Sequence, residues 1–197
     1  MTVRRIHITG GAGAGKTRLA RRLATMLGAP VYDQDGEALA VLRRLSAEDG
    51  IDYWVDPSPI MGQLLAEVGA KMAAFAAQES WVSEGSSLTG AEVLFEGADI
   101  VVMLDCTWPV AAYRIVLRHA KAELAGNNRF PGWRQLYRFC RYSVRYYRGT
   151  NPPGLNDYGV PRNNYHLYEQ VKAYESKLVV CGTNREVEAL IRRLAEE

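Results

Sequence analysis

The sequence is poor in cysteine and has no long apolar run. Its three cysteines, Cys106, Cys140 and Cys181, are widely spaced, form no CxxC pair and have no histidine cluster at metal-ligand spacing. We therefore expect neither a disulfide scaffold nor a zinc site, and we expect the thiols to act as small core side chains. No run approaches the roughly 18 to 20 apolar residues that cross a bilayer. The short stretch before the first glycine-rich loop leaves no room for the apolar core of a signal peptide, so we expect a cytoplasmic protein without a membrane partner.

The length and composition are typical of one globular domain. The chain has 197 residues, of which 48% are hydrophobic and 23% are charged. A chain of this size buries one substantial core and is too short for two catalytic domains. Because no internal repeat, low-complexity tract or interdomain linker is found, we treat residues 1–197 as a single domain.

Positive charge gathers in one segment, although the whole chain carries a formal charge of only +2. Between Leu124 and Asn156 there are six arginines and no carboxylate, a segment charge of +6. The remaining 18 basic and 22 acidic residues leave −4 for the rest of the chain. Charge concentrated in this way predicts that an anion is held by the segment.

Short apolar runs alternate with helical patterns, which is typical of a parallel α/β sheet. The five runs cover residues 3–9, 30–32, 81–83, 100–104 and 178–181. Helices are expected at 16–27, 36–45, 60–78, 109–124, 133–147 and 185–196, and Thr183 and Glu186 stand at capping-box spacing before the last of them. The stretches 46–59 and 149–164 are rich in turn residues and are expected to be loops.

The strongest motif is a phosphate-binding loop. It matches G-x-x-x-x-G-K-[ST] and lies between an apolar strand and a helical pattern, so a flexible turn without a ligand is disfavoured. In such a loop the backbone N–H groups face phosphate oxygens, the lysine reaches the β and γ phosphates, and the hydroxyl ligates magnesium. We therefore expect ATP and Mg²⁺ as cofactors. The residues concerned are Gly10, Gly11, Ala12, Gly13, Ala14, Gly15, Lys16 and Thr17.

Several motifs of other P-loop proteins are missing from the sequence. There is no [NT]-K-x-D sequence to read guanine and no LSGGQ-like signature of a transporter ATPase. The fourth apolar run ends at Asp105 and is followed by Cys106, where motor ATPases usually have an acidic pair. A small phosphotransferase is the class that remains.

Carboxylates follow the second and third apolar runs. Asp33 and Asp35 come after the second run, where alternation along a strand would point both to one side, and Glu84 follows the third. Ligands of open parallel sheets bind beyond the carboxyl ends of the strands. We expect Asp33 and Glu84 to join Thr17 in the magnesium shell and Asp35 to accept a proton from the acceptor hydroxyl. The alternatives are ordinary turn acids or, for Asp35, a helix N-cap.

Arginines with helical spacing are the candidate phosphate ligands. Arg114 and Arg118 are four residues apart and so share one helix face near the nucleotide, unless they are plain surface arginines. Asp105, just before that helix, is interpreted as a structural residue that helps to cap it. A second set steps by 4, 3, 4 and 3 along one helix, which predicts a basic lid over the phosphates with a neighbouring apolar stripe packed on the body. The arginines are Arg134, Arg138, Arg141, Arg145 and Arg148, and the stripe is Trp133, Tyr137, Cys140, Val144 and Tyr147.

Taken in order, these features resemble adenylate-kinase-like P-loop kinases, and most of all the proteins labelled DNA topology modulation proteins. The resemblance covers nearly the whole chain. It rests on the phosphate-binding loop, residues 31–35, residues 81–85, the segment from Asp105 to Arg118, and the arginine-rich helix.

The resemblance implies the P-loop NTPase fold, with a five-stranded parallel sheet of order 2-3-1-4-5, an acceptor-binding insert at about 36–79 and a lid at about 124–164. It also implies that Arg114 flanks the base, that Arg118 and one or more of the lid arginines Arg138, Arg141 and Arg145 grip the transferring phosphate, and that the turn at Gly182 lines the base pocket. True adenylate kinases carry an arginine shortly after the acidic turn of the third strand, whereas residues 86–90 contain none. The resemblance therefore does not identify AMP as the acceptor.

The leading hypothesis is an ATP-dependent kinase of a small molecule or nucleotide. Arginines interleaved with aromatic residues between 129 and 148 also suggest a nucleic-acid-binding protein, against which stands the charge of −4 on the rest of the chain. A nucleotide-dependent regulator without transfer chemistry is a third reading. Acceptor specificity is expected within 36–79, where four residues either line a pocket or build a core: Tyr53, Trp54, Met61 and Lys71.

Overall fold

The fold is built on one parallel sheet of five strands. The computed structural model describes residues 3–50, 58–86, 90–128, 131–154 and 161–196. The strands are β1 (Arg5–Gly10), β2 (Val31–Asp33), β3 (Trp81–Glu84), β4 (Ile100–Leu104) and β5 (Leu178–Cys181), and all neighbouring pairs are parallel. The order across the sheet is β2-β3-β1-β4-β5, which confirms the predicted topology.

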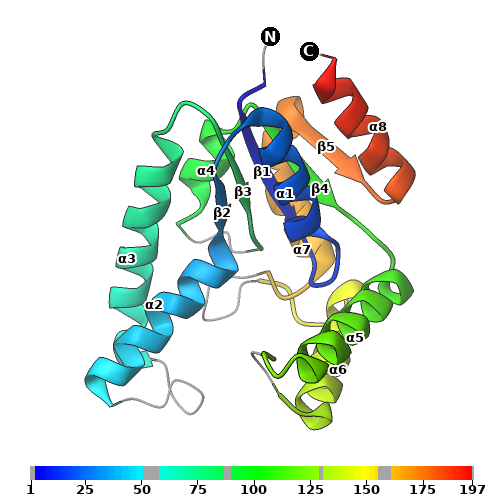
Figure 1. The fold of residues 1–197 in the computed structure, drawn as a ribbon. Helices are drawn as coiled ribbons and strands as arrows, with labels where there is room; N and C mark the ends of the chain where they lie inside the picture. Colours follow the sequence, from blue (N-terminus) through cyan, green and yellow to red (C-terminus); the bar gives the residue numbers. More distant parts are fainter. Residues whose placement is uncertain (1–2, 51–57, 87–89, 129–130, 155–160, 197) are drawn as a thin grey trace.

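Helices cover both faces of this sheet (Figure 1). Because successive side chains of a strand point to opposite faces, Ile6 and Ile8 of β1 pack in one core layer while His7 and Thr9 face the other. The first layer is closed by α1 (Lys16–Leu27), α8 (Asn184–Ala195) and part of α5 (Trp108–Leu124). The second is closed by α2 (Gln34–Asp49), α3 (Ser58–Ala76), α4 (Glu92–Gly97) and α7 (Asn164–Val171).

The helix signals of the sequence are confirmed at several termini. The helix α1 begins and ends at the predicted residues, as does α6 (Trp133–Tyr147). At the start of α8 the Thr183 side chain accepts a hydrogen bond from the Glu186 backbone N–H, and the Glu186 side chain accepts from the Thr183 N–H in return. Leu190 and Leu194 of this helix are buried, so its apolar face packs on the sheet as expected.

The expected boundaries differ from the structure in several places. The helix α2 continues to Asp49, so the first four residues of the loop expected at 46–59 are helical, and residues 51–57 lie outside the described part. The helices α4 and α7 were not predicted, because each is short and is held by apolar contacts with the sheet layer rather than by a long periodic pattern. The second loop was expected to cover 149–164, but α7 already begins at residue 164.

Helices on both sides extend past the carboxyl ends of the strands. In Figure 1 the end of the sheet that carries these carboxyl ends faces downward, with α2 on one side and α5 and α6 on the other. The 3-10 turn η1 (Lys172–Lys177) leads from α7 back into β5. Within the described residues, no helix combines the length and the apolar character needed to cross a membrane.

Candidate active site

The phosphate-binding loop joins β1 to α1 in a conformation that depends on glycine. Gly10 and Gly13 have φ values of 143° and 80°, in the region that favours glycine. A Cβ on Gly10 would lie 2.5 Å from the Leu104 carbonyl oxygen, and one on Gly13 would lie 2.7 Å from that of Ala111. The loop is thus pressed against β4 and α5, which holds its backbone in one shape.

Lys16 folds back over this loop. Its Nζ atom donates hydrogen bonds to the carbonyl oxygens of Gly10, at 3.0 Å, and Gly11, at 3.4 Å. It also donates to the Ser86 hydroxyl at 3.0 Å, and that hydroxyl in turn donates to the Gly10 carbonyl at 2.9 Å. The ammonium group is therefore held at the carboxyl end of β1 by ligands that a phosphate would replace. Sequence reasoning missed the contribution of Ser86, whose only signal was its position just after the third strand.

The side chains of Thr17 and Glu84 are hydrogen-bonded to each other next to the phosphate-binding loop. The Thr17 hydroxyl donates to Glu84 Oε1 over 2.5 Å, and Glu84 pairs with Asp33 in the register of β2 and β3. Burial raises the pKa of the Glu84 carboxyl, and the charges of Asp33 and Asp35 raise it further, whereas the Thr17 hydrogen bond and Lys16 lower it. The structure thus brings the predicted acidic residues and Thr17 together at one edge of the sheet.

Asp33 and Asp35 are positioned by the start of a helix and not, as the sequence predicted, by alternation along a strand. Strand β2 ends at Asp33 and α2 begins at Gln34, so alternation along a strand does not orient the two carboxylates. Asp33 is the N-cap of α2 and accepts a 2.9 Å hydrogen bond from the Gly36 N–H. Asp35 lies exposed in the first turn of α2, where its carboxylate makes no hydrogen bond or ion pair with another described residue. The cap expected as an alternative for Asp35 belongs to Asp33, because the helix starts two residues earlier than predicted.

Arg114 connects the phosphate-binding loop to the turn after β5. Its guanidinium donates to the Ala14 carbonyl at 2.6 Å and to Asn184 Oδ1 at 2.9 Å. The same turn begins at Gly182, whose N–H donates to Glu186 Oε2 at 2.8 Å. Arg118, one turn further along α5, is exposed, and the two arginines help to line a shallow groove of about 520 Å³ on this helix. The Arg114 side chain thus links the phosphate-binding loop to the turn that contains Gly182.

The arginine-rich helix packs on the body through a face that matches the predicted stripe only in part, because Cys140, Val144 and Tyr147 are partly buried. Trp133 and Tyr137 of the expected apolar stripe are 63% and 65% exposed, while Leu136, Ser143 and Tyr146 are buried. The arginines stand on the opposite side of the helix, because their spacing places them roughly half a turn from the buried face. The side chains of Arg134, Arg138, Arg141, Arg145 and Arg148 are all exposed, and none makes a hydrogen bond or ion pair with another described residue. Arg129 lies outside the described part of the chain.

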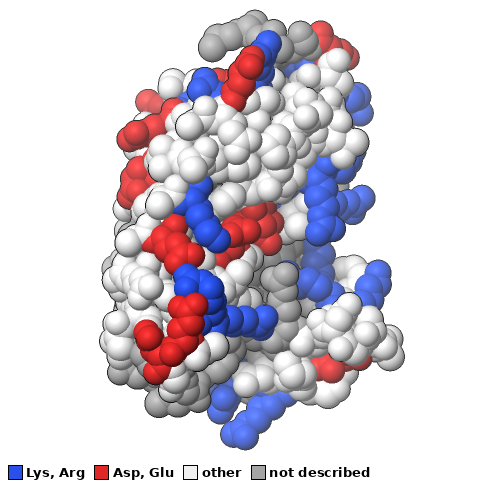
Figure 2. Space-filling model, turned by 60° about the vertical axis from the view of Figure 1, so that its left-hand side comes forward, with Lys and Arg blue, Asp and Glu red and all other residues white. Residues whose placement is uncertain are grey.

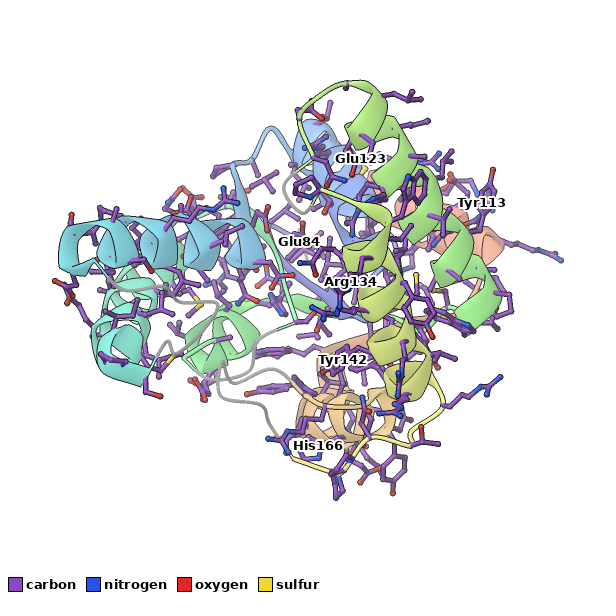
Figure 3. All side chains as sticks on the ribbon, turned by 90° about the horizontal axis from the view of Figure 1, so that it is seen from below. Glu84, Tyr113, Glu123, Arg134, Tyr142 and His166 are labelled. Atoms are coloured by element: carbon purple, nitrogen blue, oxygen red, sulfur yellow. The ribbon has the colours of Figure 1, made fainter. Side chains whose placement is uncertain are left out.

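The view from below places two residues of α6 over the middle of the molecule (Figure 3). Seen from below in Figure 3, Arg134 and Tyr142 of α6 lie around the middle of the molecule with Glu84, between α2 and α6. Arg138 is four residues from each of them and therefore shares their helix face.

Asp105 does not cap α5. The N-cap of this helix is Thr107, without a side-chain cap hydrogen bond, and the Asp105 carboxylate accepts a 2.6 Å hydrogen bond from the Asn164 side chain instead. Asp105 therefore ties the end of β4 to the start of α7. The cysteines are free, with Cys106 and Cys181 buried in the core layer under α1, as the sequence predicted.

The acidic edge offers hard oxygen ligands but not a complete metal site. Among the described residues, no group of three or more histidine, cysteine, aspartate or glutamate side chains is close enough to hold a metal ion by itself. A magnesium ion in a nucleotide site takes one or two protein carboxylates and completes its shell with phosphate oxygens and water. Thr17, Glu84 and Asp33 fit that pattern, since a divalent cation would also offset the charge that raises the Glu84 pKa.

Comparison by sequence with protein families and with curated proteins finds no match. Comparison of the fold finds shikimate kinase from Acinetobacter baumannii, at 18% identity over 99% of this chain and 92% of that chain, with a TM-score of 0.53. Shikimate kinase from Bacteroides thetaiotaomicron matches at 15% identity over 98% and 97% of the two chains, with a TM-score of 0.50. A gluconokinase from Sinorhizobium meliloti 1021 gives 19% identity, 99% and 95% coverage and a TM-score of 0.46.

The fold comparison supports the fold class that the sequence predicted. The narrower likeness to DNA topology modulation proteins and to adenylate kinases stays a prediction, because these matches do not address it. The chain has the P-loop α/β fold that small-molecule kinases share.

Proposed function

We propose that this protein is a magnesium-dependent phosphotransferase that moves the γ-phosphoryl group of ATP to a hydroxyl or phosphate of a small molecule or nucleotide. The observation that carries the proposal is the convergence of Lys16, Thr17, Glu84 and Asp33 at the carboxyl ends of three adjacent strands. In a glycine-rich turn that binds no ligand, we would not expect an ammonium group, a hydroxyl and two carboxylates to lie close together. The fold shared with two shikimate kinases supports the same reading.

In this proposal the loop and Lys16 bind the phosphates. On ATP binding, the Lys16 ammonium group would leave the Gly10 carbonyl oxygen and the Ser86 hydroxyl. It would then bind β and γ phosphate oxygens close to its present position. Thr17, Glu84 and Asp33 would hold magnesium, directly or through water. When bound, the ion supplies positive charge that stabilises the phosphates and the departing diphosphate oxygen. Arg114 and the turn at Gly182 would flank the base.

The transfer step requires an orienting base and mobile cations. Asp35 is exposed, unpartnered and close enough to influence Glu84, so it is our candidate to orient the acceptor and take its hydroxyl proton. The acceptor oxygen then forms its bond to the γ phosphorus while the bond to the bridging oxygen of ADP breaks. Arg118, Arg138 and Arg141 would neutralise the transferring charge once the lid closes. The acceptor insert at 36–79 and the lid at 124–164 remain part of this proposal.

The test is phosphate transfer from γ-³²P-labelled ATP with Mg²⁺ to a panel of sugars, polyols, amino alcohols, nucleosides and nucleotides. We expect a labelled product and production of ADP. Lys16→Ala should lose on the order of a hundredfold or more in turnover, as removal of one group that stabilises developing charge does, with a smaller loss of ATP affinity. Lys172→Ala is the matched control, because that lysine lies in η1, away from the loop. ATP binding without transfer to any compound would refute the enzyme assignment.

A further inference from the structure

The two signs of charge divide between two parts of the chain. Residues 31–99 contain three basic and thirteen acidic side chains, which gives 3 − 13 = −10. The remainder contains 21 basic and 9 acidic side chains, which gives +12 and restores the total of +2. Figure 2 shows acidic side chains mostly on the left of one face and basic side chains mostly on its right, with a hollow between them. The part that carries α2 and α3 is therefore strongly anionic.

The basic residues of this acidic part are not placed to bind an anion at the strand ends. Arg44 pairs with Glu48 and Glu67, and Lys71 pairs with Glu37 at 3.1 Å. Arg43 lies eight residues after Asp35 on α2, or about 12 Å along the helix axis at roughly 1.5 Å per residue. The segments 51–57 and 87–89, which lie outside the described residues, contain no lysine or arginine in the sequence. An acceptor phosphate or carboxylate would therefore find no free cation on this side.

A buried hydrogen-bond acceptor without a partner lies at the same place. Gln34 is 2% exposed, and its Oε1 atom has no hydrogen-bond partner, while its amide donates to the Met72 sulfur at 3.4 Å. This carboxamide packs directly over Gly85, the residue after Glu84, where a Cβ would collide with it. A buried carbonyl oxygen without a donor carries a substantial desolvation cost, which a ligand N–H or O–H would relieve.

The two side chains at the start of α2 thus provide a buried hydrogen-bond acceptor without a partner among the described residues and an exposed negative charge. The Asp35 carboxylate, on the residue after Gln34, is exposed and makes no hydrogen bond or ion pair with another described residue. An acceptor with a carboxylate or phosphate would meet like charge, whereas an ammonium group would find opposite charge and an oxygen to which it can donate. The lid arginines stand on the other side, where the phosphates of ATP compete for them.

We propose that the phosphoryl acceptor is a hydroxyl compound that carries a protonated amine and no anionic group, such as an amino sugar or amino alcohol. This inference rests on the proposed phosphotransferase function. It assigns Asp35 and the Gln34 carbonyl oxygen to recognition of the amine and its neighbouring hydroxyl groups. It excludes nucleoside monophosphates and sugar acids as preferred acceptors.

A matched set of acceptors tests the inference. Glucosamine, glucose and gluconate share one carbon skeleton and differ in charge, as do ethanolamine, ethylene glycol and glycolate, and AMP is added as an anionic nucleotide. We expect kcat/KM for the amines to exceed that of the neutral partners by about tenfold, as one favourable charge contact gives. The preference should shrink with added salt. Equal use of neutral compounds, or preference for an anion, overturns the inference while leaving the kinase proposal intact.

Binding provides a readout that does not depend on turnover. Calorimetric titration of the same compounds, with Mg²⁺ and a non-hydrolysable ATP analogue present, should show the amines binding more tightly than the neutral and anionic partners. Asp35→Asn should weaken amine binding by about fivefold and weaken binding of the neutral compound by less, because only the amine loses a charge contact. Asp49→Asn is the control, since Asp49 is exposed at the far end of the same helix. If the wild type does not prefer the amines, or if Asp35→Asn leaves that preference unchanged, the inference is wrong.

Discussion

The phenol of Tyr147, the last residue of α6, donates a 2.9 Å hydrogen bond to the carbonyl oxygen of Ala12 in the middle of the phosphate-binding loop. Its hydroxyl also lies 3.7 Å from the Cys106 sulfur, and its ring packs close to the Cα of Gly11. Burial is the main reason that the pKa of this phenol is raised far above its usual range, so it stays protonated and able to donate. The arginine-rich helix is thereby tied to the loop that would hold the phosphates.

Removing the Tyr147 hydroxyl should loosen this connection without removing the ring. We expect Tyr147→Phe to lower the free energy of unfolding by about 1 kcal/mol, the usual net contribution of one hydrogen bond. The Kd for ATP should also change, because the loop loses a restraint on Ala12. Tyr137→Phe is the control, since Tyr137 is 65% exposed. Urea unfolding and nucleotide titration measure the two effects, and equal stability of the two variants would show that the bond contributes nothing.

Asp33 combines a cap and a charge, and substitution separates them. Asparagine caps a helix about as well as aspartate, so we expect Asp33→Asn to keep the hydrogen bond from the Gly36 N–H and to change stability by less than about 0.5 kcal/mol. Asp33→Ala should lose about 1 kcal/mol. Both variants lack the carboxylate and should need a several-fold higher Mg²⁺ concentration for half-maximal turnover. An unchanged magnesium requirement in Asp33→Asn would remove Asp33 from the metal shell.

The lid arginines should differ in importance according to their position on α6. Arg138 shares the helix face of Arg134 and Tyr142, two residues that lie over the middle of the molecule in Figure 3, whereas Arg148 follows the end of the helix. We expect Arg138→Ala to lower kcat by on the order of tenfold or more, with Arg141→Ala acting in the same direction. Arg148→Ala is the matched control and should lower kcat less. Steady-state kinetics at saturating ATP measure this difference, and equal rates for Arg138→Ala and the wild type would contradict the lid assignment.

His7 makes the stability of the fold depend on pH. It is fully buried in β1 against Phe95, its Nδ1 lies 2.8 Å from the Ser83 hydroxyl, and burial lowers its pKa from 6.5 to about 3. Below pH 6.5 the unfolded chain therefore binds a proton that the folded chain does not, so stability falls as the pH falls toward 3. At pH 5 the loss from this group should reach about 2 kcal/mol, at about 1.4 kcal/mol per pH unit.

The His7 prediction is measured by urea unfolding at pH 7.5 and pH 5. His7→Gln has no titrating group at this position, so the difference between wild type and variant should grow in favour of the variant as the pH is lowered. Carboxylates titrate equally in both proteins and cancel in the comparison. A constant difference between the two proteins would mean that the pKa of His7 is the same in the folded and the unfolded chain.

Local patterns were sufficient for the elements whose signals lie within a few residues. The strand and helix on either side of Gly10–Thr17, the capping box at Thr183 and the helix from Trp133 to Tyr147 each carry their own periodicity or terminal signal. The start of α2 carried no such clear signal, because Asp33, Gln34 and Asp35 suit either a strand end or a helix start. The structure places the helix start at Gln34, where Asp33 caps it.

The packing face of α6 shows why the remainder needed tertiary structure. The sequence predicts one apolar stripe on this helix, but the face that packs also depends on how the helix meets α5 and the phosphate-binding loop. Tyr147 of that stripe donates to the Ala12 carbonyl and Tyr146 beside it is buried, whereas Trp133 and Tyr137 at the other end of the stripe are exposed. The packing face of α6 is therefore set by contacts between residues more than a hundred positions apart, such as Ala12 and Tyr147.

The sequence by itself determined the phosphate-binding loop, the parallel sheet and the separation of positive from negative charge, because these follow from local spacing and composition. The strand order was implied only by the resemblance to adenylate-kinase-like P-loop kinases. Only the tertiary structure decided that Ser86 holds Lys16, that Asp33 caps α2 beside Glu84, and that Gln34 leaves an unpartnered oxygen over Gly85. Each of these depends on side chains that the sheet brings together from distant segments. Hydrogen bonds and burial act over a few ångströms, and only the folded chain sets which atoms are that close.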